Sequence, residues 1–325
     1  MKKLLVIAVA TALIAPAAAM ADTTLYGNLH ASVGTVDSGT TSDTVVESHS
    51  SRLGVKGSTE LDNGLSATYG TEFNLELDGD NSANNLTTRN QFVGLKGGFG
   101  EVRVGKHDTP AKLATSGLDA FGDTYGAMEK IVAADNHRVN NAVAYITKAG
   151  PVGLAVAHST APTTNDATAS STTAANTAMA NYSNGPVYAG LGYTTIDSLA
   201  TDINLGVGYK HEAGHFANVV YETVEGDATA GAGVPTLGLP PANATDTNIY
   251  VAGGFKTGAA TLKAGYGSGD RDTGGEETMT NVGVDYSLGK KTSAYVLWSE
   301  NENDARVLNG TAKTTATAVG LVTQF

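Results

Sequence analysis

The histidines are the residues of this chain that most readily suggest catalysis or metal binding, and their positions favour neither. There are seven histidines and no cysteine, so thiolate metal sites are excluded. His211 and His215 have the spacing of a helical zinc motif, but Ala213-Gly214 between them indicates a turn, where helical geometry does not apply. No local pattern suggests a serine hydrolase. We therefore predict no enzyme activity, no catalytic residues, no metal site and no cofactor.

Two acidic clusters are the other candidates for ion binding. Asp270-Arg-Asp272 and Glu300-Asn-Glu302-Asn-Asp304 carry oxygen ligands of the kind that bind Ca²⁺ weakly. Solvated loops are the simpler interpretation, and we prefer it. The whole chain has 32 acidic and 20 basic residues, a net charge of −12, which argues against a nucleic-acid partner.

Polar and apolar residues alternate along most of the chain, in segments of about ten residues separated by turns. This pattern is typical of a transmembrane β-barrel. The clearest example is 65–77, where Tyr69 and Phe73 share one face and Glu72 lies on the other. Connections alternate between short and long, and residues 36–47 are expected to form a loop. The sixteen predicted strands span 23–35, 51–60, 65–77, 89–96, 101–106, 138–147, 152–159, 178–183, 187–195, 203–212, 215–224, 248–256, 260–267, 278–288, 292–300 and 314–325.

The alternation also predicts which charges face the interior of such a barrel. A charged side chain in contact with lipid costs about 2–4 kcal/mol at the membrane midplane. Lys56 shares a face with Arg52 and lies opposite the apolar Val55, so both bases should point inward. The final strand, 314–325, should pair with the first strand, because closure removes both sheet edges.

The first 21 residues have the features of an export signal. Lys2 and Lys3 precede an apolar run, and Ala19-Met20-Ala21 fits a cleavage site. The run is short for a spanning helix, which needs about 20 apolar residues. We therefore expect a signal peptide at 1–21 and a single barrel domain at 22–325.

Several motifs resemble those of Gram-negative general diffusion porins. Their order and spacing carry the resemblance, which is densest in the first half of the chain. The motifs are Leu25-Tyr26-Gly27, Ser51-Arg-Leu-Gly-Val-Lys-Gly57, Leu61-Asp-Asn-Gly-Leu65, Arg89-Asn-Gln-Phe-Val-Gly-Leu-Lys-Gly-Gly-Phe-Gly100, Gly105-Lys-His-Asp-Thr-Pro110, Arg138-Val-Asn-Asn-Ala-Val-Ala-Tyr145 and the terminal Phe325.

The resemblance implies an all-β fold, a transmembrane 16-stranded antiparallel barrel with a third external loop that folds inward and narrows the pore. That loop is 107–137 here, and it lacks the Pro-Glu-Phe-Gly-Gly run of enteric porins. Asp119, Asp123 and Glu129 are the acidic candidates for the constriction. Arg52, Arg89 and Arg138 match the family's basic wall, and Lys56 joins them by alternation. A role in bracing the loop remains open for these arginines.

The resemblance further implies a homotrimer in the outer membrane of a Gram-negative bacterium, among outer-membrane lipids and lipopolysaccharide. Phe325 would be read by the outer-membrane assembly machinery. The expected function is passive diffusion of small hydrophilic solutes and ions, with a weak preference for cations. Charges that face each other across the pore would polarise the water in a narrow gap, so that small polar solutes align and pass. A monomeric substrate-specific porin and a structural or adhesive barrel remain the alternatives.

Overall fold

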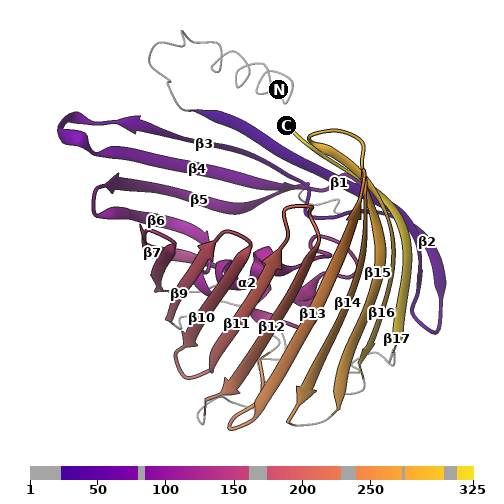
Figure 1. The fold of residues 1–325 in the computed structure, drawn as a ribbon. Coiled ribbons are helices and arrows are strands. Elements are labelled where there is room, and N and C mark those ends of the chain that lie inside the picture. The colour runs from indigo at the N-terminus through magenta and orange to yellow at the C-terminus, as the bar shows by residue number, and fades with distance from the viewer. Residues whose placement is uncertain (1–22, 80–84, 161–173, 228–238, 273–274, 304–312) are drawn as a thin grey trace.

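The chain folds as a closed antiparallel β-barrel of sixteen strands (Figure 1). This computed structural model describes residues 23–79, 85–160, 174–227, 239–272, 275–303 and 313–325. The expected signal peptide at 1–21 lies outside the described residues. No helix among the described residues has the length and hydropathy needed to cross a membrane.

The strands follow one another around the barrel in chain order. β2 and β3 pair with successive parts of β1 and together occupy one position, which gives sixteen barrel strands from seventeen segments. The segments are β1 (Thr24–Asp37), β2 (Ser42–Ser48), β3 (Arg52–Glu60), β4 (Ser66–Leu75), β5 (Leu86–Gly97), β6 (Gly100–Asp108), β7 (Arg138–Ala149), β8 (Val152–Ser159), β9 (Ala175–Asn184), β10 (Val187–Ile196), β11 (Ala200–Lys210), β12 (Phe216–Gly226), β13 (Thr245–Thr257), β14 (Ala260–Arg271), β15 (Glu276–Ser287), β16 (Thr292–Asn303) and β17 (Lys313–Gln324).

The prediction of a loop at 36–47 was wrong. β1 continues to Asp37, and β2 begins at Ser42 and pairs with it, so only 38–41 form the connection. The segment reads as a loop because its residues are mostly polar. Its β-branched residues nevertheless favour a strand, and backbone pairing with β1 needs no apolar face.

The barrel is closed by β1 and β17, as predicted. Their register runs from Asn28 opposite Gln324 to Asp37 opposite Thr315. The Phe325 ring lies over Gly27, where a Cβ atom would come within 2.3 Å of the ring. The Phe325 N–H donates to the Gly27 carbonyl at 3.2 Å, and the Gly27 N–H donates back at 3.3 Å. The terminal aromatic residue therefore covers the seam of the barrel.

Opposite faces of each strand have opposite character. On β11, Ile203, Leu205 and Val207 are 44–49% exposed, and they point outward. Residues that alternate with them, Asp202 and Asn204 among these, are buried in the barrel interior. An apolar exterior around a polar interior is the arrangement that a lipid environment requires.

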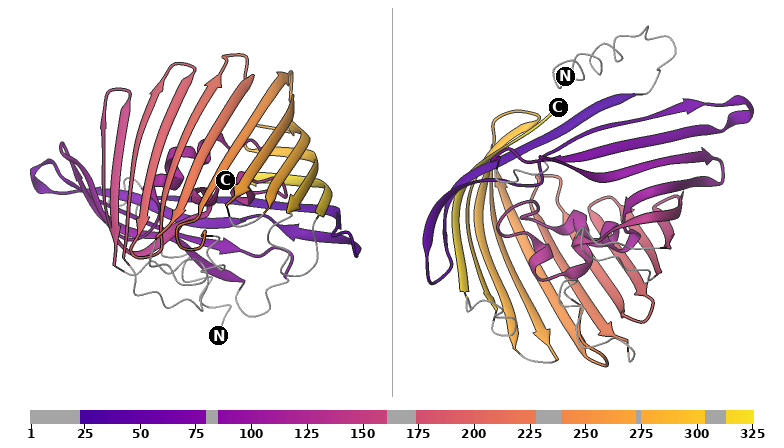
Figure 2. Two further views of the ribbon diagram at one scale, coloured as in Figure 1. Left: turned by 90° about the horizontal axis from the view of Figure 1, so that it is seen from below. Right: turned by 180° about the vertical axis from the view of Figure 1, so that it is seen from behind.

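The connection between β6 and β7 lies inside the barrel, as Figure 2 shows from two directions. We call residues 109–137 the constriction loop. It contains α2 (Pro110–Thr115), capped by the Thr109 hydroxyl that accepts from the Lys112 N–H at 3.1 Å. Three short 3₁₀ turns follow, η2 (Ser116–Leu118), η3 (Met128–Lys130) and η4 (Ala133–Asn136). A further turn, η1 (Asp62–Gly64), joins β3 to β4.

Candidate functional site

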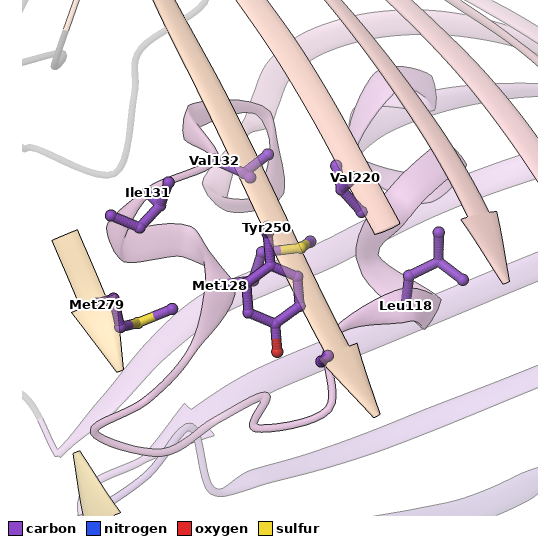
Figure 3. Close-up of a cluster of buried hydrophobic side chains, with 8 residues drawn as sticks. Leu118, Met128, Ile131, Val132, Val220, Tyr250 and Met279 are labelled. Atoms are coloured by element: carbon purple, nitrogen blue, oxygen red, sulfur yellow. The ribbon is translucent and has the colours of Figure 1, made fainter. Parts of the chain in front are cut away.

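The constriction loop packs one apolar face against the inner side of β10–β16 (187–303), which we call the anchoring wall. Figure 3 shows the centre of this contact, where Met128, Ile131 and Val132 lie beside Tyr250 and Val220. All five side chains are at most 2% exposed. The loop therefore has a fixed, dry side, and its remaining side faces the rest of the lumen.

Polar side chains of the anchoring wall also hold the loop backbone. Six of the described wall side chains donate hydrogen bonds to loop carbonyl oxygens, and each comes from a different strand. The pairs are Tyr188 to Ala114 (2.8 Å), Asn204 to Ala111 (3.1 Å), Asn218 to Leu118 (2.8 Å), Lys263 to Ala120 (2.7 Å), Asn281 to Gly126 (2.8 Å) and Ser299 to Tyr125 (3.3 Å). Such bonds satisfy carbonyl groups that have no partner within regular secondary structure.

Asp119, predicted to face the pore, directs its carboxylate back into the loop. Its oxygens accept from the backbone N–H groups of Phe121 (2.8 Å) and Met128 (2.9 Å) and from the Tyr250 hydroxyl (3.3 Å). Burial raises the pKa of Asp119 to about 6, although these hydrogen bonds oppose the shift. The residue organises the turn between 119 and 128.

Arg52 and Asp123 meet between the barrel wall and the loop. The Arg52 Nη1 atom lies 3.0 Å from Asp123 Oδ2, and the two side chains are 27% and 35% exposed. Asp123 has φ of 55°, a left-handed conformation that aspartate adopts more readily than most residues. Of the residues predicted for the constriction, these two are the ones that the structure joins in an ion pair across loop and wall.

Arg89 and Arg138 have other partners. Arg89 Nε lies 2.7 Å from Glu72 on the neighbouring strand, and Glu72 also accepts from the Tyr26 hydroxyl at 2.9 Å. Arg138 lies 2.7 Å from Asp108, at the point where the loop begins and ends. We call β3–β7 (52–149, without the constriction loop) the charged wall, because its arginines pair with acids mainly within it. Arg103 and Glu101, 2.6 Å apart, form a further pair of this kind.

Lys56 and Glu129 are both exposed. The Lys56 ammonium group lies 4.9 Å from the centre of the Tyr26 ring, on the inner face that alternation predicts. Glu129 lies in η3 and forms no ion pair with any residue that the structure describes. The structure thus brings neither residue to the Arg52–Asp123 pair.

Comparison with known proteins decides the family. The family model described as Gram-negative porin matches residues 6–306. The chain belongs to the Gram-negative porin family. It is therefore an outer-membrane channel protein, and nothing indicates catalysis.

Relatives and solved structures agree with this assignment. The porin is 27% identical to the major outer membrane protein P.IB of Neisseria meningitidis (strain H44/76), over 91% of this chain and 92% of the relative. An anion-selective porin from Comamonas acidovorans has the same fold, with a TM-score of 0.75 and 20% identity over 93% of this chain and 99% of that one. The trimer form of the outer membrane protein OmpT of Vibrio cholerae gives a TM-score of 0.67 at 19% identity, with coverage of 93% and 99%.

Lys263 and Asp285 are functional candidates of this porin that the sequence analysis missed. Lys263 Nζ lies 2.8 Å from Asp285, and it also lies 4.6 Å from the centre of the Phe121 ring. Together with Arg52 and Asp123, they line a cavity of about 220 Å³ between the loop and the barrel wall. Lys263 lies between the apolar residues Leu262 and Ala264, so the alternation argument used for Lys56 could have found it.

Four histidines of the porin form hydrogen bonds within the barrel or its turns. His211 and His215 each accept a backbone N–H bond on Nδ1, at 3.1 Å in both cases. In the neutral imidazole, this leaves Nε2 of each ring as the protonated nitrogen. His30 bonds to Tyr295 at 2.9 Å, and His49 bonds to Ser32 at 2.7 Å. Within the part of the chain that the structure describes, no three His, Asp or Glu residues are placed to hold a metal ion.

Proposed function

We propose that this porin lets small hydrophilic solutes and ions diffuse passively across the outer membrane, with a weak preference for cations. The Arg52–Asp123 pair is the observation that carries the proposal. It joins the loop to the opposite wall, beside a lumen cavity that also contains the Lys263–Asp285 pair. Charges of both signs therefore lie together beside the constriction loop.

The partial exposure of the Arg52–Asp123 pair favours a role in ion permeation over a role in holding the loop in place. Partly exposed ion pairs contribute little to stability, because water screens them. The same charges orient polar solutes and attract ions in a narrow water-filled gap. The buried contacts of the anchoring wall can hold the loop without the Arg52–Asp123 pair.

Cation preference is supported by acids that gather beside the constriction loop. Asp43, Glu47, Glu76 and Asp78 line a cavity of about 490 Å³ together with Tyr125 of the loop, and none of the described lining residues is basic. Arg89 and Arg138, in contrast, are paired with acids. Charges act only over about 8–10 Å in physiological salt, so these local groups matter more than the net charge of −12. The Comamonas porin shares the fold and is anion-selective, so the proposed cation preference rests on the charged residues of this chain and not on its fold.

We propose that the functional unit is a homotrimer in a membrane of phospholipid and lipopolysaccharide. The trimeric Vibrio protein of the same fold supports this assembly. Phe325, which covers the barrel seam, is the proposed signal for the assembly machinery. A monomeric substrate-specific porin would differ in conducting through single rather than triple steps.

Planar-bilayer recording tests the proposal. Folded protein should give current steps in groups of three, and a KCl gradient should give a reversal potential of the sign expected for cations. A folded protein that passes no current would favour a structural or adhesive barrel. A reversal potential of the opposite sign would refute the proposed selectivity.

A further inference from the structure

Glu222 anchors the part of the constriction loop that returns to the wall. It lies on β12 with no exposed surface, and its carboxylate accepts from the N–H groups of Ala133 and Ala134, both at 2.8 Å. Asn248 adds a third hydrogen bond at 2.6 Å. The six wall donors bind loop carbonyls, whereas Glu222 binds loop N–H groups with a carboxylate, and such charge-assisted bonds are the stronger kind.

A second carboxylate lies beside Glu222, and no residue in the described part of the chain forms a hydrogen bond with it. Asp202 on β11 is 3% exposed, and both of its carboxylate oxygens lack a hydrogen-bond partner there. Asn204 is directly opposite Glu222 in the strand register, so Asp202 is the diagonal neighbour of Glu222 on the same inner face. Diagonal neighbours are about 7–8 Å apart, within electrostatic reach.

The other charges around the pair do not neutralise Asp202. Arg271 bonds to Asn248 at 3.0 Å, but its guanidinium group also pairs with two acids of its own, Asp246 and Glu277. On the loop, Lys112 lies 3.6 Å from Asp108. Burial lowers the pKa of His137 to about 4, so it is neutral at physiological pH. The described neighbourhood therefore contains more acids than bases.

We propose that Asp202 holds a proton when the loop is docked, and that losing this proton weakens the attachment of Ala133 and Ala134 to Glu222. Two neighbouring buried carboxylates do not both ionise at low cost. Glu222 has three donors and keeps the charge, which leaves the proton to Asp202. If Ala133 and Ala134 detach from Glu222, water reaches both carboxyl groups and Asp202 ionises as an ordinary carboxyl. Asp202 holds its proton more tightly while the loop is docked, so docking is favoured in acid and weakens as pH rises.

This inference rests on the proposed channel function, because current reports the motion of the loop. The test records open-channel noise and closing frequency in bilayers from pH 5 to pH 9. The wild type should be quiet at the acid end, and closing frequency should rise by up to about tenfold per pH unit across the transition. Asp202→Asn imitates the protonated group and should stay quiet throughout. Glu222→Gln should also lose the pH dependence but be noisy at every pH, since it lacks the charged anchor.

Glu101→Gln is the matched control. It removes another buried inner carboxylate, one that pairs with Arg103 on the charged wall, and it should keep the wild-type pH profile. A wild-type profile in Asp202→Asn, or a flat profile in the wild type, overturns the inference. If Asp202→Asn does not fold, the persistence of wild-type pH dependence in Glu222→Gln overturns it. A folded wild type without current at any pH contradicts the proposed function instead.

Discussion

The two walls that face the constriction loop differ in how they use polar residues. The anchoring wall holds the loop with buried apolar side chains and with mostly neutral donors such as Asn218 and Asn281. The charged wall carries several ion pairs, and Arg52 reaches the loop through a partly exposed one. Burial stabilises the loop, whereas solvated charges contribute little to stability and remain available to ions. Substitutions on the two walls should therefore have separable effects.

The largest effect is expected at the centre of the anchoring wall. Tyr250→Ala removes a fully buried ring that packs on Met128, together with the hydroxyl bond to Asp119. By analogy with other aromatic-to-alanine changes in cores, it should cost about 3–5 kcal/mol. The folded barrel should therefore unfold at a lower temperature, which semi-native gels measure. Tyr221→Ala removes an outward-facing, 44% exposed ring and should have a much smaller effect. Equal effects would show that the buried contact between Tyr250 and the loop does not stabilise the barrel.

The next largest effect is expected on ion selectivity, from a substitution on the side of the loop that faces the charged wall. Asp123→Asn removes the acid that faces Arg52 and should lower the cation-to-anion permeability ratio by about two- to fivefold. Reversal potentials in a KCl gradient measure this ratio. The melting behaviour of the folded barrel should stay close to that of the wild type. Unchanged selectivity with reduced stability would show that the Arg52–Asp123 pair holds the loop in place and does not select ions.

The pH dependence of stability should separate Asp119 from Asp123, although they are four residues apart. Because burial raises the pKa of Asp119 to about 6, its contribution to stability is fully present below its ordinary pKa of about 4 and is lost as pH rises through about 6. Thermal dissociation between pH 4 and pH 7 should show this decline in the wild type. Asp119→Asn should flatten it. A decline of the same size in Asp119→Asn would assign it to another group.

The smallest effect is expected at Glu129. Its side chain is exposed and has no described ion-pair partner, so Glu129→Gln should change the permeability ratio by less than Asp123→Asn does. Stability on semi-native gels should not change. A larger shift in reversal potential than that of Asp123→Asn would indicate that the constriction lies nearer η3 than Asp123.

The sequence predicted the barrel well because lipid imposes a simple rule on every strand. Alternation predicted that Glu72 faces inward, and it is buried there beside Arg89. The same rule applied to 260–267 would have predicted an inward Lys263. The rule failed at β2, where polar residues pair with β1 without an apolar face. It therefore detects membrane-facing strands better than polar extensions.

Partners inside the barrel could not be predicted in the same way. Arg89 pairs with Glu72 because the register of β4 and β5 brings them together, and the sequence does not specify that register. Asp119 and Asp123 are both aspartates of the same loop, and the sequence does not distinguish them. Only the carboxylate of Asp119 accepts hydrogen bonds from the backbone N–H groups of Phe121 and Met128, so it points into the loop. Such choices follow from the packing of the loop as a whole.

The most direct test of the account asks whether Asp123 borders the path of ions. The chain has no cysteine, so Asp123→Cys provides a single thiol for modification during bilayer recording. A bulky, negatively charged methanethiosulfonate reagent should reduce the open-channel current sharply in Asp123→Cys and have little effect in Asp119→Cys. Loss of current in Asp119→Cys, with none in Asp123→Cys, would contradict the proposed constriction.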